Sequence, residues 1–153
     1  MRIYLFRGLL GNFFSLGMDK LAKRLRKEGH IVTVHGWMAR RSVQRKAIKE
    51  FKARKANYII MVGGHSLGGN SANYMSNNLV RAGVPVRATF TWDATAPRKH
   101  LGKGEAHNFM SSDFRAQEVP GATDHHFDNL SHIQVDKDQT THDLVVSYAN
   151  GLA

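Results

Sequence analysis

The sequence predicts an α/β protein built as a three-layer sandwich, with a mostly parallel central sheet of about five or six strands. Short apolar runs of the length of buried strands alternate along the chain with segments whose apolar residues recur at helical spacing. This alternation is typical of parallel strands joined by crossover helices. The 153 residues are 42% hydrophobic, which is enough for one buried core but not for two. We therefore expect a single domain over residues 1–153.

The first part of the chain contains three predicted strands and two predicted helices. The strands are residues 3–6, 30–35 and 58–63, each of them an apolar or alternating run. The first helix follows a glycine-rich turn at residues 8–12, has one apolar face and ends at Gly29. The second helix begins at about Ser42, the expected N-cap. The inward residues are Met18, Leu21, Ala22 and Leu25 in the first helix, and Val43, Ala47, Ile48 and Phe51 in the second.

The second part of the chain continues the alternation. A helix with an apolar face formed by Ala72, Met75, Leu79 and Val80 ends near Gly83, and a strand at residues 86–92 follows. After a loop at residues 94–104, a short strand is expected at residues 107–111, and the polar segment 117–129 has room for one more. Asp138 is the expected N-cap of a last helix. Its inward residues are Leu144, Val145, Tyr148 and Ala149.

A serine stands at the apex of the turn that follows the third predicted strand. The motif is Gly64-His65-Ser66-Leu67-Gly68-Gly69, with a helical pattern directly after it. A serine hydroxyl becomes a nucleophile when the backbone lifts it clear of the sheet and a histidine removes its proton. The flanking glycines fit such a sharp corner, and the helix N-terminus favours developing negative charge. The alternative is a glycine-rich turn in which Ser66 only caps the helix.

Three segments together resemble the lipase and esterase branch of the α/β-hydrolase superfamily. The nucleophile turn of the family resembles Gly64-His65-Ser66-Leu67-Gly68 of this chain. The segment that carries the family's acid resembles Thr91-Trp92-Asp93-Ala94-Thr95-Ala96-Pro97, and the family's histidine loop resembles Ser131-His132-Ile133. The order Ser, Asp, His is that of the family. The resemblance covers most of the chain, but most members are considerably longer. It implies a minimal α/β-hydrolase domain without a separate lid domain.

The resemblance implies a serine hydrolase that cleaves carboxylic esters through an acyl-enzyme, with Ser66, Asp93 and His132 as the catalytic triad. A small-molecule ester or acyl compound would be the substrate. Thioester hydrolysis and acyl transfer to an alcohol use the same triad and stay open as alternatives. Without a lid, the site would be open and would favour short or exposed acyl groups.

Among the nine histidines, His132 is the expected base, because it lies in a loop just before the last predicted helix. His125 and His126, in the polar segment, are its rivals. Five of the other histidines lie on or beside predicted strands, inside the serine turn, or in the last helix: His30, His35, His65, His107 and His142.

The acid that orients the base is expected to be Asp93, which ends an apolar strand and needs a partner for its charge. Asp113, which follows the next strand, is the alternative acid, and Asp124 and Asp128 remain behind it. The simplest competing interpretation of Asp93 is a residue that only forms a turn.

The oxyanion needs two backbone N–H donors. Leu67, directly after the serine, would supply one, and Leu9 the other, with Leu10 as the alternative. Many relatives have His-Gly where this loop reads Arg7-Gly8-Leu9. The loop lacks the glycine and lysine pattern of a nucleotide-binding loop.

The formal net charge of +10 is unevenly distributed, because thirteen of the 22 Lys and Arg residues lie between residues 20 and 55. Such a basic face could attract nucleic acid or an anionic surface. We favour the solvated side of two helices, since no aromatic residues are interleaved with these charges and no nucleic-acid motif is present. A non-catalytic polyanion-binding protein on a hydrolase scaffold is the alternative from another functional class.

Asp124-His125-His126-Phe127-Asp128, together with His132, is rich in metal-ligand side chains but matches no established ligand spacing, so we expect no metal or other cofactor. The absence of cysteine excludes disulfides. No apolar run approaches the ~18 residues of a membrane span. The first strand begins at once, leaving no room for a signal peptide. These features predict a cytoplasmic protein, with a processed exported form as the alternative.

Overall fold

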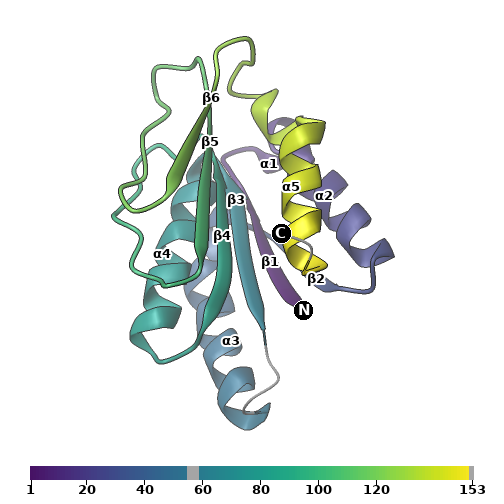
Figure 1. Cartoon of the computed structure of the whole chain (residues 1–153), viewed down its shortest axis with the longest axis vertical. Coiled ribbons are helices and arrows are strands. Elements are labelled where there is room, and N and C mark those ends of the chain that lie inside the picture. Colours follow the sequence, from purple (N-terminus) through teal and green to yellow (C-terminus); the bar gives the residue numbers. More distant parts are fainter. Residues whose placement is uncertain (55–58, 152–153) are drawn as a thin grey trace.

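A six-stranded, fully parallel sheet runs through the centre of the molecule (Figure 1). The computed structural model describes residues 1–54 and 59–151. The strand order is β2-β1-β3-β4-β5-β6. The strands are β1 (Arg2–Arg7), β2 (Ile31–Gly36), β3 (Ile60–His65), β4 (Val86–Trp92), β5 (Glu105–Ser111) and β6 (Thr123–Phe127). The sixth strand lies in the polar segment where one more strand was expected, and Tyr58 of the third predicted strand lies outside the described residues.

Helices cover both faces of the sheet and complete the predicted three-layer sandwich (Figure 1). Helices α2 (Leu16–Lys27) and α5 (Gln139–Ala149) pack on one face, and α3 (Arg40–Arg54) and α4 (Leu67–Arg81) on the other. Successive residues of strand β1 face opposite sides of the sheet, so both sides need cover. Ile3 and Leu5 pack in the core beneath α2 and α5, and Tyr4 and Phe6 pack in the core beneath α3 and α4.

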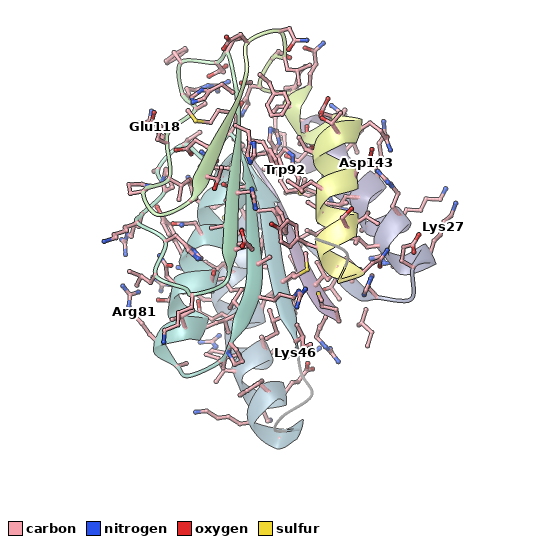
Figure 2. All side chains as sticks on the ribbon, viewed as in Figure 1. Lys27, Lys46, Arg81, Trp92, Glu118 and Asp143 are labelled. Carbon is pink, nitrogen blue, oxygen red and sulfur yellow. The ribbon has the colours of Figure 1, made fainter. Side chains whose placement is uncertain are left out.

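Trp92, the last residue of β4, anchors the last helix to the sheet. Its buried indole lies between the sheet and α5 (Figure 2), where Nε1–H donates to Thr141 Oγ1 over 2.9 Å.

Among the described residues, none of the helices combines the length and apolar character that a membrane span needs.

Local signals placed most helix ends correctly. Helix α2 stops just before Gly29, whose φ is 86°, and the Asp138 carboxylate accepts the N–H of Thr141 as the N-cap of α5. Ser42 was wrong as an N-cap. A 3-10 turn, η1 (Trp37–Ala39), leads directly into α3, and the Ser42 hydroxyl donates to the Ala39 carbonyl within it.

The strand order reverses at β1, and this reversal positions the candidate site. From β1 the chain passes to β2 on one side, then returns to add β3, β4, β5 and β6 on the other. In open parallel sheets the crevice at the carboxyl ends of strands beside such a switch is where ligands bind. The loop after β1 therefore meets the turn after β3. This loop contains the short helix α1 (Gly11–Phe14), which begins inside the turn predicted at residues 8–12 and extends past it.

Candidate active site

Ser66 joins β3 to α4 with a backbone conformation that non-glycine residues rarely adopt. Its φ is 60° and its ψ is −123°, a strain that costs on the order of 1–3 kcal/mol. The Ser66 N–H donates to the Trp92 carbonyl over 2.8 Å, and the Ser66 carbonyl accepts from Asn70 N over 3.2 Å. The hydroxyl makes no capping hydrogen bond to α4, so helix capping does not account for this serine.

The glycines on either side of Ser66 allow β3, α4 and β1 to approach closely. A Cβ atom on Gly64 would lie 2.0 Å from the carbonyl oxygen of Gly68. A Cβ atom on Gly68 would lie 2.2 Å from the carbonyl oxygen of Phe6. No side chain fits at either position without movement of the backbone. The sharp corner therefore depends on glycine both before and after the serine.

Ser66, His132 and Asp93 form a continuous chain of hydrogen bonds. His132 Nδ1 lies 2.8 Å from Asp93 Oδ2, and His132 Nε2 lies 2.9 Å from Ser66 Oγ. A carboxylate can only accept, so Nδ1 carries the proton and Nε2 is free to accept the serine hydroxyl. The three residues come from the turn after β3, the end of β4, and the loop before the short turn η3 (Val135–Lys137).

Asp93 is fully buried and is fixed by more than its contact with His132. Its Oδ1 accepts the backbone N–H of Ser111 over 2.6 Å, and its Oδ2 accepts the Ser111 hydroxyl. Its own N–H donates to the Phe109 carbonyl over 2.9 Å, and its φ is 48°. Because the Ser111 N–H, the Ser111 hydroxyl and the His132 ring all donate to the carboxylate, the burial of its charge is compensated.

The competing acids and bases bind other residues or are exposed to solvent. Asp113 binds Arg115 through two side-chain contacts of 2.9 and 3.1 Å, and this guanidinium lowers the pKa of Asp113 to about 2. Asp124 accepts from Asn108 Nδ2 over 2.8 Å, and a ring nitrogen of His125 lies 2.9 Å from His107 Nδ1. The side chains of His126 and Asp128 are exposed. Within residues 1–54 and 59–151, no group of three or more His, Asp or Glu side chains is placed to hold a metal ion.

A buried histidine inside the serine turn, His65, supports the site in a role that the sequence did not predict. His65 Nε2–H donates to the carbonyl oxygen of His132 over 2.7 Å, so its Nδ1 accepts from the Ser15 hydroxyl over 2.8 Å. Burial lowers the pKa of His65 to about 4, so the ring is neutral at neutral pH. Ser15 Oγ in turn accepts the N–H of Gly8 over 3.0 Å. The loop of His132 and the loop after β1 are therefore joined through His65.

Asp136, in η3, attaches the histidine loop to the start of α2. Its Oδ2 accepts the N–H of Gly17 over 2.9 Å, and its backbone carbonyl accepts from His142 Nε2 over 2.7 Å. A Cβ atom on Gly17 would lie 2.0 Å from that same carbonyl oxygen. Burial raises the pKa of Asp136 to about 7. No motif predicts this contact, since Gly17 and Asp136 are 119 residues apart.

Ser66 borders a pocket of about 260 Å³, whose apolar lining comes mainly from the loop after β1. Leu9, Leu10, Phe14 and Ile133 contribute the apolar side chains. A Cβ atom on Gly8 would lie 3.0 Å from Ser66 Cβ, so this loop passes directly beside the serine. Leu67 is the first residue of α4, and the helix offers its N–H no acceptor.

Comparison with known proteins places the fold. No protein-family model matches the sequence. No curated protein matches it either. Among solved structures, the chain is similar to a candidate hydrolase of the α/β superfamily from Xanthomonas campestris pv. campestris, with a TM-score of 0.59 and 16% sequence identity over 95% of this chain and 98% of that chain. The expected α/β-hydrolase fold is thereby confirmed, and at this identity the likeness concerns the fold.

Proposed function

We propose that this protein is a serine hydrolase that cleaves carboxylic esters through an acyl-enzyme. The observation that carries the proposal is the hydrogen-bond chain from Asp93 through His132 to Ser66, with heavy-atom distances of 2.8 and 2.9 Å. A fixed carboxylate, an oriented imidazole and a serine on a strained turn are the three groups that acyl transfer needs. The proposed triad is therefore Ser66, His132 and Asp93.

In the acylation step, His132 Nε2 takes the hydroxyl proton as Ser66 Oγ attacks the ester carbonyl. Asp93 accepts the Nδ1–H throughout and stabilises the imidazolium. When the tetrahedral intermediate collapses, the bond to the alcohol breaks, and the Nε2 proton passes to the leaving oxygen. His132 then removes a proton from water, which attacks the acyl carbonyl, and Ser66 Oγ leaves and recovers the proton.

The oxyanion of each tetrahedral intermediate would be held by the N–H groups of Leu67 and Leu9. Leu67 is supported by its place at the first turn of α4, where the helix dipole also favours negative charge. Leu9 is supported by the proximity of Gly8 to Ser66 and by its place in the pocket lining. Two preorganised donors of this kind contribute several kcal/mol of barrier lowering.

Labelling with a fluorophosphonate probe tests the proposal, because the probe reacts with activated serines. We expect labelling of the native protein, none of Ser66→Ala and little of His132→Ala. Ser147→Ala on α5 and His126→Ala on β6 are the matched controls and should label like the native protein. A folded native protein that stays unlabelled would overturn the proposal.

The leaving group is tested with matched substrates. An alkyl oxoester and the thioester of the same acid, compared by kcat/KM, separate an esterase from a thioesterase that uses the same triad. Product analysis in the presence of an added alcohol separates hydrolysis from acyl transfer. We expect the oxoester to be hydrolysed with water as the preferred acceptor.

A further inference from the structure

A groove runs along one face of α4 and begins beside Leu67, the residue that follows Ser66. Leu67, Tyr74 and Arg81 follow one another at seven-residue spacing, which places them on the same side of the helix. The first part of the groove, about 370 Å³, lies beside Leu67 and is walled by Trp37 and Met38 of η1. The second part, about 210 Å³, is lined by arginines, and the two parts share Arg40, Arg41 and Tyr74.

Four arginines from three separate elements meet in the second part of the groove. Arg40 and Arg41 begin α3, Arg81 ends α4 (Figure 2), and Arg98 lies in the loop after β4. The Tyr74 ring holds two of them, because the guanidinium carbons of Arg40 and Arg98 lie 5.6 and 5.0 Å from its centroid. The positions of the Arg40 and Arg98 charges are therefore set by packing.

The loop that carries Arg98 is tied to α4. The Arg98 N–H donates to Asn73 Oδ1 over 2.8 Å, and Asn73 Nδ2 donates back to the Arg98 carbonyl over 3.0 Å. Asn77 forms an equivalent pair with Leu101 N–H and the Lys99 carbonyl, at 2.9 Å each. This wall of the groove is consequently built before any ligand arrives, which lowers the entropy cost of binding.

No carboxylate neutralises this cluster. All twelve Asp and Glu residues of the sequence lie within the described part of the chain, and none of the ion pairs formed there includes Arg40, Arg41, Arg81 or Arg98. Burial and the charges of Arg41 and Arg98 lower the pKa of Arg40 from its ordinary value. Four like charges held together without a counterion favour the binding of an anion. The N–H groups of a guanidinium can form paired hydrogen bonds to the oxygens of a carboxylate or a phosphate.

We propose that the substrate of the esterase is anionic, with a carboxylate or phosphate group that binds in the arginine part of the groove. The inference rests on the proposed function. Leu67 and Tyr74 are seven residues apart on α4, which corresponds to about 10 Å along the helix. An anionic group held by Arg40 and Arg98 at the Tyr74 ring would therefore lie about 10 Å from Leu67 along α4. The spacer to the reacting carbonyl would pass the apolar side chains of Trp37 and Met38.

Esters that differ only in terminal charge test the inference. One series consists of p-nitrophenyl monoesters of dicarboxylic acids with increasing spacer length, each compared with its neutral ω-methyl ester. A second series consists of ω-phosphorylated alkyl acetates compared with the ω-hydroxyl compounds. We expect an anionic group to raise kcat/KM at least tenfold over its neutral counterpart at a spacer of about 10 Å. If the gain is larger in the first series, the groove prefers a carboxylate, and if it is larger in the second, a phosphate.

Variants assign that preference to the groove. The double variant Arg40→Gln/Arg98→Gln should lose most of the preference for the charged ester. The control is Arg45→Gln, because Arg45 is an exposed arginine of α3 that does not line the groove. This variant should keep the preference. Equal kcat/KM for charged and neutral esters by a protein whose Ser66 reacts with the fluorophosphonate would overturn the inference and leave the proposed function standing.

Calorimetry with suberate and with inorganic phosphate tests the groove without catalysis. Saturable binding to the native protein that is lost in Arg40→Gln/Arg98→Gln and kept in Arg45→Gln supports the site even if Ser66 proves unreactive. Retention of single-stranded DNA with a steep salt dependence, with no binding of either small anion, would instead identify a polyanion surface and overturn the inference.

Discussion

The ring of His65 is hydrogen-bonded to the main chain of His132, with 2.7 Å between His65 Nε2 and the His132 carbonyl oxygen. The side chain of His132 faces Ser66. His132 is therefore held in place through its backbone while its imidazole contacts the serine. Through Ser15, the same ring also reaches the loop after β1. We therefore assign His65 a positioning role in the proposed hydrolase.

Replacing His65 by alanine should slow the reaction of Ser66 by about tenfold or more, because the loop of His132 loses its anchor. Leaving the His132 carbonyl without a donor should also lower the free energy of unfolding by about 1–3 kcal/mol. Fluorophosphonate labelling rates, measured well below the melting temperature, give the first quantity.

His65→Gln should recover part of the rate, since an amide N–H can replace the ring donor. The control for general destabilisation is Val145→Ala in the core under α5, which lowers stability by about 1–3 kcal/mol without touching the loop. Equal labelling rates for His65→Ala and Val145→Ala would show that His65 has only a structural role.

Asp93→Asn should lower kcat/KM for p-nitrophenyl acetate by roughly 10³–10⁴, the effect of removing the acid from a serine triad. Asp113→Asn should change it by less than about threefold, because Asp113 is bound to Arg115. Steady-state kinetics of the two variants decide between the two acids. A larger loss in Asp113→Asn than in Asp93→Asn would contradict the assignment.

Gly64→Ala and Gly68→Ala should each destabilise the protein by about 3 kcal/mol or more, since each new Cβ would lie 2.0–2.2 Å from a backbone carbonyl oxygen. Gly36→Ala is the matched control, because nothing lies within 4 Å of a Cβ there and its φ is −69°. Its effect on stability should stay within about 0.5 kcal/mol. Urea titration of the three variants measures these differences.

Asp136→Asn should change how stability depends on pH. The folded protein holds the Asp136 proton up to about pH 7, whereas an unfolded chain releases it near pH 4. The native state thus binds more protons in this window, so the contribution of Asp136 to stability falls as pH rises from about 4 to about 7.

The asparagine variant lacks this loss, so its unfolding free energy relative to the native protein should increase by on the order of 4 kcal/mol over that window and level off above it. The pKa of His65, whose Nδ1 lies 3.8 Å from Asp136 Oδ2, is lowered to about 4, so His65 contributes a slope of opposite sign between about pH 4 and 6.5. Above about pH 6.5 that contribution is constant, so the change between pH 6 and 8 reports mainly Asp136. Urea titrations at pH 4.5, 6 and 8 measure the effect, and a constant difference would contradict it.

The proposed site should prefer short or exposed acyl groups. Leu9 and Leu10, at the rim of the 260 Å³ pocket, are 62% and 60% exposed, which indicates an open entrance. Among neutral p-nitrophenyl esters, kcat/KM should be higher for acetate and butyrate than for palmitate. Activity confined to emulsified long-chain lipid would contradict an open site.

The order of strands and helices could be predicted because its signals are local. Strand β4 was predicted at its observed bounds, Val86–Trp92, from an apolar run between turn residues. Asp138 was predicted as an N-cap from its place before a helical pattern. The turn around Ser66 was also a local feature, since both glycines that it requires are its neighbours in sequence.

The geometry of the candidate site is a tertiary result that the sequence could only partly anticipate. Ser66, Asp93 and His132 were expected together from a family resemblance, and the structure brings them to hydrogen-bonding distance. Nothing local marked His65, because a histidine beside a serine can face solvent, the core or the site. Its partners, Ser15 and the His132 carbonyl, lie 50 and 67 residues away.

The sequence by itself determined the fold class, most of the helices and strands, and the strained serine turn, because hydrophobic periodicity and turn chemistry act between residues a few positions apart. The tertiary structure decided which polar groups share a buried space and which charges share a groove. Arg40, Arg81 and Arg98 show this plainly. They are far apart in sequence, and only the packing of α3, α4 and the loop after β4 brings them to one groove.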